Sequence, residues 1–215
     1  MNRKSKMLLG TSFCLLGAFV LWTVLLCLVD VQAIGPRGSA VGFATLNRAV
    51  HRMTGVHMPL YHVTDWLGLV PVAVAAAFAV LGLVQWIGRK RFLAVDRSLL
   101  SLGVFYIAVI AVYLLFEEVV INYRPTLIEG VLEASYPSST TVLALCVMPT
   151  AMMQMGRRIG KLTERRLLLG LAAAFTAFMV LARLFSGVHW ISDIVGGVLV
   201  SGALVTAYAA SFYWE

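Results

Sequence analysis

The sequence predicts an all-α membrane protein, a bundle of six transmembrane helices, and three observations lead to this prediction. The chain of 215 residues is 60% hydrophobic and only 13% charged, with a mean hydropathy of +0.90, which is far from the composition of a soluble domain. Its apolar residues gather into six runs, and a helix needs about 20 such residues to cross a bilayer. No internal repeat, low-complexity tract or soluble linker divides the chain, so residues 1–215 are expected to form one membrane domain.

The first run is too long for a signal-peptide core and lacks a small-x-small cleavage site, so it is interpreted as a retained span. The fourth run is the shortest. The fifth and sixth are separated only by a Ser-Gly-Val-His-Trp stretch, in which Gly187 predicts a tight hairpin rather than one continuous helix. The expected spans are residues 7–31, 66–87, 99–120, 140–155, 167–185 and 191–212.

Positive charges are distributed unevenly between the two sides of this bundle. Twelve of the seventeen Lys and Arg residues lie before the first span, between the second and third spans, or between the fourth and fifth. Because basic residues favour cytoplasmic loops, both termini are predicted to be cytoplasmic, with the opposite face extracytoplasmic. The net charge of +7 then reflects topology and attraction to anionic membrane lipids, and no nucleic-acid partner is predicted.

The longest connection, residues 33–64, lies on the predicted extracytoplasmic side. Over residues 41–53 apolar residues recur at helical spacing, with His51 on the polar side, which predicts an amphipathic helix on the outer surface. Such a helix would either cover a site or cap the bundle. The spacing of His51, His57 and His62 does not place them on one helical face, so they are expected at the surface and not as metal ligands.

A histidine and two charged residues lie where the apolar chain leaves the membrane before the last span. Groups so costly to bury there usually serve chemistry. If a helix begins near Val188, His189 and Asp193 lie one turn apart and within hydrogen-bond reach. The carboxylate would then fix one ring nitrogen and leave the other free to attack. Arg183, folded back by the break at Gly187, would complete a phosphate site.

The connection between the third and fourth spans brings a second arginine, Arg124, to the same side. Pro137 precedes Ser138-Ser139-Thr140, a sequence typical of a helix N-terminus. Free backbone N–H groups and the positive end of the helix dipole favour an anion there, although serines at such positions also serve as plain caps. Combined with the group around His189, this start predicts a phosphate-binding site.

These residues resemble the type 2 phosphatidic acid phosphatase superfamily of integral-membrane lipid phosphatases. Its third motif, Ser-Arg, five residues, His, three residues, Asp, is matched by Arg183, His189 and Asp193, with Ala182 in place of serine. The order of the motifs, their external placement and the six-span layout also look like the family. The resemblance therefore covers most of the chain.

The resemblance implies that His189 is a nucleophile that takes the phosphoryl group as a phosphohistidine, which water then hydrolyses, without a metal or other cofactor. Asp193 would orient the histidine. Positive groups and hydrogen-bond donors would hold the phosphate oxygens and stabilise charge as the bond breaks. The residues expected in that role are Arg124, Arg183, Ser138, Ser139 and Thr140.

The second motif of the family, Pro-Ser-Gly-His, is only half kept, because Ser139 replaces the glycine and Thr140 the histidine. That histidine is thought to protonate the leaving oxygen, and threonine cannot do so at neutral pH. A phosphate leaving group, with a second pKa of about 6, needs little such help. The departure therefore favours a lipid diphosphate, such as a polyprenyl diphosphate, over a phosphate monoester.

The first motif, Lys, six residues, Arg-Pro, keeps Arg124-Pro125 but has Glu117 for the lysine, followed by Glu118. Both glutamates are interpreted as modulators of the site. Three interpretations of Glu117 stay open: it supplies the missing acid, it pairs with Arg124, or it marks a site that binds without hydrolysis.

The leading prediction is a lipid phosphatase at the outer leaflet, with a phosphorylated lipid as its partner. The alternatives are a lipid phosphotransferase, in which a hydroxyl replaces water, and a lipid-phosphate binding or transport protein. In a bundle without a site, Arg183 would pair with Asp193 or Glu117 and leave no anion-sized pocket. Nothing in the sequence indicates an oligomeric state.

Overall fold

Helices account for most of residues 2–214, which are described by the computed structural model. No strand forms within this range, and the all-α prediction is confirmed. The elements are α1 (Arg3–Leu28), η1 (Pro36–Gly38), α2 (Ala44–Thr54), α3 (Met58–Leu67), α4 (Leu69–Arg89), η2 (Phe92–Ala94), α5 (Arg97–Glu118), α6 (Ser139–Arg158), α7 (Leu162–Phe185) and α8 (Ile191–Phe212).

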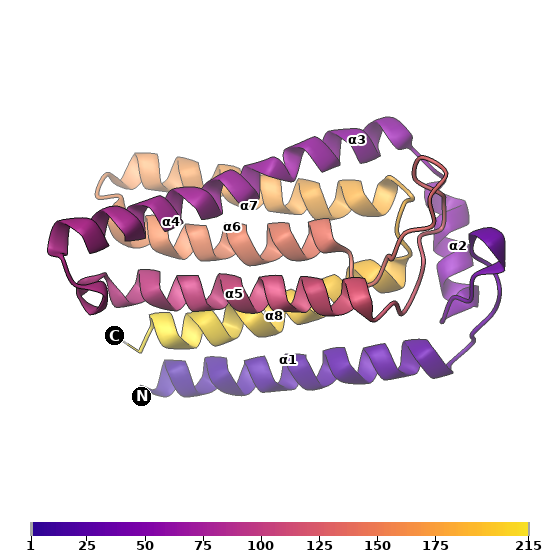
Figure 1. The fold of residues 1–215 in the computed structure, drawn as a ribbon, viewed down its shortest axis with the longest axis horizontal. Helices are drawn as coiled ribbons and strands as arrows, with labels where there is room; N and C mark the ends of the chain where they lie inside the picture. Colours follow the sequence, from indigo (N-terminus) through magenta and orange to yellow (C-terminus); the bar gives the residue numbers. More distant parts are fainter. Residues whose placement is uncertain (1, 215) are drawn as a thin grey trace.

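Within residues 2–214, five helical segments are long and apolar enough to cross a membrane: α1, α3 with α4, α5, α7 and α8. The chain is therefore an integral membrane protein. The expected fourth span became α6, a helix of 20 residues that runs alongside the others (Figure 1) but is not among the five. It buries polar residues such as Thr150 and Gln154, and a helix packed among other helices needs less hydropathy than one that faces lipid. The count of six spans stays a prediction.

The second span begins earlier than the sequence indicated. Residues 58–64, expected in the external connection, belong to α3, which runs into α4 in nearly the same direction after a break at Gly68 (Figure 1). Pro59 is compatible with this start because a proline in the first helical turn sacrifices no intrahelical hydrogen bond. The polar residues of α3 concealed the helix from a search for apolar runs, and two of them, Tyr61 and Thr64, are buried.

A helix does form in the external connection, as α2, but its faces differ from the expected ones. Asn47 is fully buried against the bundle, where it contacts Ser192, whereas Leu46 and Met53 are exposed. His51, expected at the surface, is half-buried, and its Nε2 lies 3.1 Å from the carbonyl oxygen of Gly187. The prediction for His51 was wrong because burial here follows polar contacts with the bundle. Binding of α2 to the membrane surface stays a prediction.

Helix α8 forms the centre of the bundle and contacts α1, α2, α5, α6 and α7. Its small residues allow this close packing. A Cβ on Gly196 would lie 2.4 Å from the ring of Tyr136, so the glycine makes room for that ring. Tyr136 also stacks on Phe19 with ring centroids 6.1 Å apart. The connection between α5 and α6 is thereby anchored to the core directly beside Ser135.

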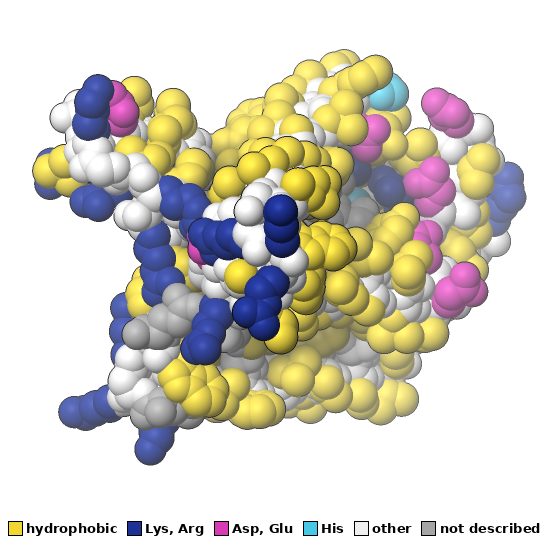
Figure 2. All heavy atoms as spheres, turned by 60° about the vertical axis from the view of Figure 1, so that its left-hand side comes forward, with side chains coloured by type: hydrophobic (Ala, Val, Ile, Leu, Met, Phe, Trp, Pro, Cys, Tyr) yellow, Lys and Arg dark blue, Asp and Glu magenta, His cyan; other side chains and the backbone are white. Residues whose placement is uncertain are grey.

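The two ends of the bundle differ in charge. Both termini and the α4–α5 and α6–α7 connections lie at one end (Figure 1), where the three basic clusters of the sequence are found. Seen from that side, Lys and Arg cover much of the near surface, while most visible Asp and Glu lie toward the far end (Figure 2). The basic clusters therefore share one end, as the topology prediction requires.

Candidate active site

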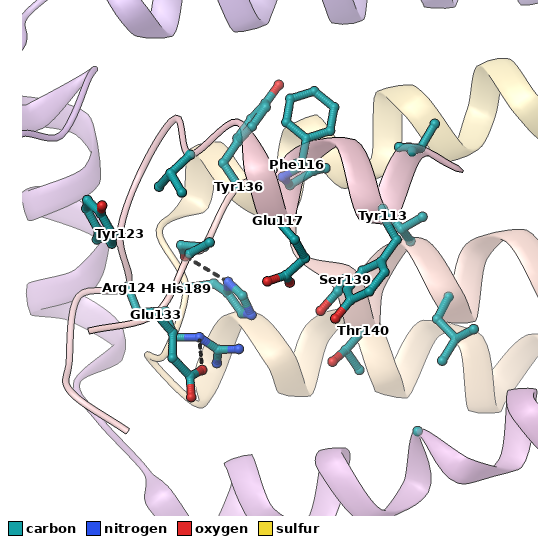
Figure 3. Close-up of a pocket in the computed structure, with 18 of the residues that line it drawn as sticks. Tyr113, Phe116, Glu117, Tyr123, Arg124, Glu133, Tyr136, Ser139, Thr140 and His189 are labelled. Atoms are coloured by element: carbon teal, nitrogen blue, oxygen red, sulfur yellow. Dashed lines mark hydrogen bonds and ion pairs between the residues drawn. The ribbon is translucent and has the colours of Figure 1, made fainter. Parts of the chain in front are cut away.

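A cavity of about 890 Å³ opens at the end of the bundle opposite the termini. Its walls come from the α3–α4 junction, the second half of α5, the α5–α6 connection and the start of α6, and His189 also lines it (Figure 3). One part is apolar, with Val109, Phe116 and Leu143. The polar part carries Asp65, Tyr113, Glu117, Tyr123, Arg124, Glu133, Ser135, Ser139, Thr140 and His189.

The expected direct hydrogen bond between His189 and Asp193 is not made. The His189 Nδ1 and Asp193 Oδ2 atoms are 3.9 Å apart, and the hydroxyl of Ser135 lies between them. Ser135 Oγ is 2.9 Å from His189 Nδ1 and donates to Asp193 Oδ2 at 2.6 Å. The prediction was wrong because α8 begins at Ile191 rather than near Val188, which leaves His189 outside the helix.

This arrangement determines which nitrogen of His189 is free. The single proton of Ser135 points to the carboxylate, which accepts only, so Nδ1 of a neutral ring must donate to Ser135 Oγ. The other nitrogen, Nε2, is buried and has no hydrogen-bond partner among the described residues. Burial lowers the pKa of His189 well below its ordinary value of 6.5, and the guanidinium groups of Arg124 and Arg183 lower it further. The ring is neutral at physiological pH, with an available lone pair on Nε2.

Asp193 is fully buried and held on both oxygens. Besides Ser135, its Oδ2 accepts from the backbone N–H of Trp190 at 2.9 Å. Its Oδ1 accepts from Asn122 Nδ2 at 3.1 Å and from Ser192 Oγ at 3.4 Å. Because a buried carboxylate without such donors would be costly, these contacts fix its position.

Asn122, Arg124 and Ser135 come from one antiparallel hairpin between α5 and α6. Its register is set by the backbone bonds from Ser135 N to Asn122 O at 2.9 Å and from Arg124 N to Glu133 O at 3.1 Å. Sequence reasoning missed Ser135 because no local pattern reveals this register. The only available signal was its place two residues before the Pro137-Ser138 pair.

Arg124 lies close to His189, as expected for a phosphate ligand. It is 8% exposed, and its Nε is 3.0 Å from Glu133 Oε2. Its Nη1 is buried and has no hydrogen-bond partner among the described residues. The suggested pair between Arg124 and Glu117 was wrong, since Glu133 takes that place in the hairpin. One edge of the guanidinium is thus held by the protein and the other is available to an anion.

Arg183 is 1% exposed and is held by α3, behind the cavity wall. Its Nη1 donates to Thr64 Oγ1 at 3.0 Å, and its Nη2 lies 3.7 Å from Asp65 Oδ1. The Tyr61 ring contacts both arginines, with centroid distances of 4.8 Å to Arg183 and 5.9 Å to Arg124. The alternative of a bundle without a site predicted that Arg183 pairs with Asp193 or Glu117 and that no anion-sized pocket forms. It was wrong, because Arg183 pairs with neither residue and a cavity is present.

Helix α6 begins at Ser139, as predicted, but only part of its start faces the cavity. Ser139 and Thr140 line it. Ser138 is fully buried outside the cavity wall, and its backbone N–H donates to the carbonyl oxygen of Asp193 at 3.2 Å. The expected contact between Ser138 and phosphate is therefore not supported, because packing against α8 uses its backbone donor.

The two acidic residues at the end of α5 are placed differently. The carboxylate of Glu117 points into the cavity between His189 and Ser139 (Figure 3). Glu118 is exposed and does not line the cavity. Within residues 2–214, no group of three or more His, Cys, Asp and Glu side chains is placed to hold a metal ion.

The loop that carries His189 is clamped by the α2–α3 connection. The backbone N–H of His57 donates to Ser186 O at 2.9 Å, and His51 lies beside the Trp190 ring at a centroid distance of 5.3 Å. Gly187 has a φ of +68°, and a Cβ there would lie 1.8 Å from Gly55 O. Only glycine satisfies both the left-handed backbone and this close approach.

Comparison with known proteins adds two findings. A family model described as the PAP2 superfamily matches residues 118–215, which contain the hairpin and the His189 network. The chain also resembles the crystal structure of a transmembrane PAP2-type phosphatidylglycerolphosphate phosphatase from Bacillus subtilis, with a TM-score of 0.54 and 17% sequence identity. That match covers 95% of this chain and 96% of the other, and it shows a common fold. No curated protein sequence matches the chain.

The family match and the shared fold agree with the placement of His189, Arg124 and Asp193 around one cavity. The resemblance inferred from the motifs is confirmed: residues 118–215 match the PAP2 superfamily model, and the chain shares the fold of a PAP2-type phosphatase.

Proposed function

We propose that this protein is a membrane lipid phosphatase in which His189 Nε2 forms a phosphohistidine. The observation that carries the proposal is the environment of this atom. It is buried, has no protein partner among the described residues, and belongs to a ring that lines the same cavity as Arg124. A buried polar atom without a partner is costly unless a ligand occupies the site.

The chemistry follows from this geometry. The lone pair of Nε2 attacks the phosphorus, and the bond from phosphorus to the leaving oxygen breaks with its electron pair on that oxygen. Arg124, through its free Nη1, and the N-terminus of α6 stabilise the charge on the phosphoryl oxygens. Water then attacks phosphorus, the electron pair of the N–P bond returns to Nε2, and inorganic phosphate leaves.

The proposed substrate is a lipid diphosphate such as a polyprenyl diphosphate. Thr140, which lines the cavity, cannot act as the acid for an alkoxide leaving group, whereas a lipid phosphate leaves with little help. The apolar part of the cavity, with Val109, Phe116 and Leu143, suits a lipid chain beside the phosphates. A lipid substrate is also consistent with the shared fold of the phosphatidylglycerolphosphate phosphatase.

The decisive experiment measures phosphate release by purified protein from lipid diphosphates and from lipid monophosphates. His189→Ala is expected to abolish release, whereas His62→Ala, which changes an exposed histidine outside the cavity, should leave it unchanged. Equal release by His189→Ala would overturn the proposal. A preference for monophosphates would overturn the substrate class alone.

A lipid-phosphate binding or transport role is the second candidate, favoured by the presence of Glu117 and Thr140 in the cavity. Tight binding of a lipid diphosphate with no turnover over a wide substrate panel would support it. Phosphotransfer to a lipid or sugar hydroxyl is tested in the same assay by adding such acceptors and looking for a phosphorylated product.

We place the site at the extracytoplasmic face because the three basic clusters lie at the opposite end of the bundle. A cysteine substituted for Glu129 in the hairpin should react with a membrane-impermeant thiol reagent added outside intact cells. Reaction only after lysis would reverse the orientation.

A further inference from the structure

The hydroxyl of Ser135 lies between the His189 ring and the Asp193 carboxylate, two groups that the sequence predicted to be in direct contact. The side chain is 2% exposed. Its oxygen lies within hydrogen-bond distance of both His189 Nδ1, at 2.9 Å, and Asp193 Oδ2, at 2.6 Å. The 3.9 Å between Nδ1 and Oδ2 is too long for a hydrogen bond. Asp193 therefore acts on the ring of His189 through Ser135.

The surroundings hold this serine in place from two sides. Its backbone N–H donates to Asn122 O at 2.9 Å, and Asn122 itself donates to Asp193 Oδ1. On the other side Tyr136 is fixed in the core beside Gly196. The hairpin register and the packing of Tyr136 in the core thus fix the position of the serine oxygen.

We propose that Ser135 is a positioning residue, the middle member of a His189–Ser135–Asp193 relay that keeps the proton on Nδ1 and the lone pair on Nε2. The inference rests on the proposed function of His189 as a nucleophile. As the bond from Nε2 to phosphorus forms, the ring becomes cationic while Nδ1 keeps its proton. The hydroxyl accepts from that N–H and donates to the carboxylate, so the negative charge of Asp193 stabilises the ring across one polarised hydroxyl.

The relay also connects the two halves of the site. Ser135 and Arg124 belong to the same hairpin, whereas His189 and Asp193 come from the α7–α8 loop and the start of α8. A shift of the hairpin that moved Arg124 would also move the serine oxygen away from Nδ1. Orientation of the nucleophile and binding of phosphate are therefore coupled through one segment.

The test compares Ser135→Ala with Ser135→Thr in the phosphate-release assay. Alanine keeps the backbone bond to Asn122 but removes the hydroxyl, and kcat should fall about tenfold to a hundredfold, the range expected for loss of support to a reacting group, with KM unchanged. Threonine restores the hydroxyl and should recover most of kcat. Ser201→Ala, which alters an equally buried serine of α8 outside the site, should leave kcat unchanged.

A spectroscopic measurement separates a relay from a merely structural role. The chain has only four histidines, so the ¹⁵N signals of His189 can be assigned by difference from His189→Gln. Wild type should show a protonated Nδ1 and an unprotonated Nε2. Ser135→Ala should change the Nδ1 signal and populate the other tautomer.

An unchanged kcat in Ser135→Ala would overturn the relay, and so would a fall in kcat with unchanged His189 signals. A folded Ser135→Thr with the rate of the alanine variant would also overturn it. Absence of turnover by wild type would instead refute the proposed function, and the ¹⁵N signals would still report whether Ser135 holds Nδ1.

Discussion

At the end of the bundle that carries the termini, the buried polar groups around Gln154 are paired with one another, whereas around His189 at the opposite end several are left without partners. Gln154, which is fully buried in α6, donates to Ser98 O at 3.0 Å and to the Tyr208 hydroxyl at 2.5 Å, and its Oε1 accepts from Arg158. Asp96 nearby receives bonds from Gln85 and Arg89. This polar cluster ties α4, α5, α6 and α8 together.

The cavity end contains more buried polar residues, and their pairing is incomplete. The unpartnered atoms there include Arg124 Nη1, Arg183 Nε, His189 Nε2, Ser138 Oγ and Thr141 Oγ1. Since burying such groups without partners costs roughly 1–3 kcal/mol each, this end sacrifices stability. The polar groups around Gln154 therefore serve structure, whereas Arg124 Nη1 and His189 Nε2, whose residues line the cavity, are left open to a ligand.

The largest expected effect is that of Arg124→Ala at the cavity end. Loss of one preorganised donor to the transition-state oxygens typically lowers kcat about 10²- to 10³-fold. Folding stability should change little, because the arginine has an unpartnered Nη1 and its partner Glu133 is 38% exposed. Steady-state kinetics and a detergent unfolding assay measure both quantities. A large loss of stability with normal kcat would show that Arg124 serves the fold and would contradict the difference between the two ends of the bundle.

The opposite pattern is expected for Gln154→Ala. Removing a fully buried amide with several hydrogen bonds should destabilise the protein by about 2–3 kcal/mol and leave kcat/KM of the folded fraction unchanged. Thr141→Val is the matched change near the site: it removes a buried hydroxyl without a partner, so stability should stay equal or rise by about 1 kcal/mol. If both variants are destabilised equally, the two ends do not differ as argued.

A smaller effect is expected for Glu117→Gln, which removes a carboxylate that points into the cavity. Less repulsion should strengthen inhibition by inorganic pyrophosphate about tenfold, the scale of one charge pair at partial exposure. Glu118→Gln, outside the cavity, should leave inhibition unchanged. A collapse of kcat in Glu117→Gln with unchanged inhibition would instead identify Glu117 as the proton donor that Thr140 cannot be.

Long apolar runs were enough to predict the helical bundle, because hydropathy is a local property of the chain. The separate α7 and α8 followed from Gly187 in the same way. The start of the second span was missed because Thr64 and Asp65 of α3 are polar, and a polar side chain can contact water or, as these two do, another side chain, here Arg183. A purely local reading cannot distinguish these two purposes.

For the candidate site, the spacing of residues along the chain was enough to predict which side chains lie near one another, but contacts that depend on tertiary register were not predictable. The spacing of His189 and Asp193 correctly predicted that the two side chains lie near each other. The direct hydrogen bond between them was not predicted correctly, because Asp193 Oδ2 accepts from the Trp190 N–H and helps to start α8 at Ile191. An acidic residue in the first turn is a known helix-start signal. Ser135 was beyond prediction because the hairpin places it there.

The smallest expected effect is on the pH dependence of folding stability, to which His189 contributes at the cavity end and Asp96 at the terminal end. The pKa of His189 is well below 6.5 in the folded protein. Below pH 6.5 the unfolded chain therefore binds a proton that the folded protein does not, and the free energy of unfolding decreases as the pH is lowered. At the other end, a hydrogen bond from Gln85, with further help from Arg89, lowers the pKa of Asp96 below 3.8, so its contribution is lost only near pH 4 and below. Between pH 6.5 and 5.5 wild type should therefore lose about 1 kcal/mol that His189→Gln does not lose. Detergent unfolding curves at the two pH values measure the difference, and parallel losses in both proteins would show that His189 is not held neutral in the cavity.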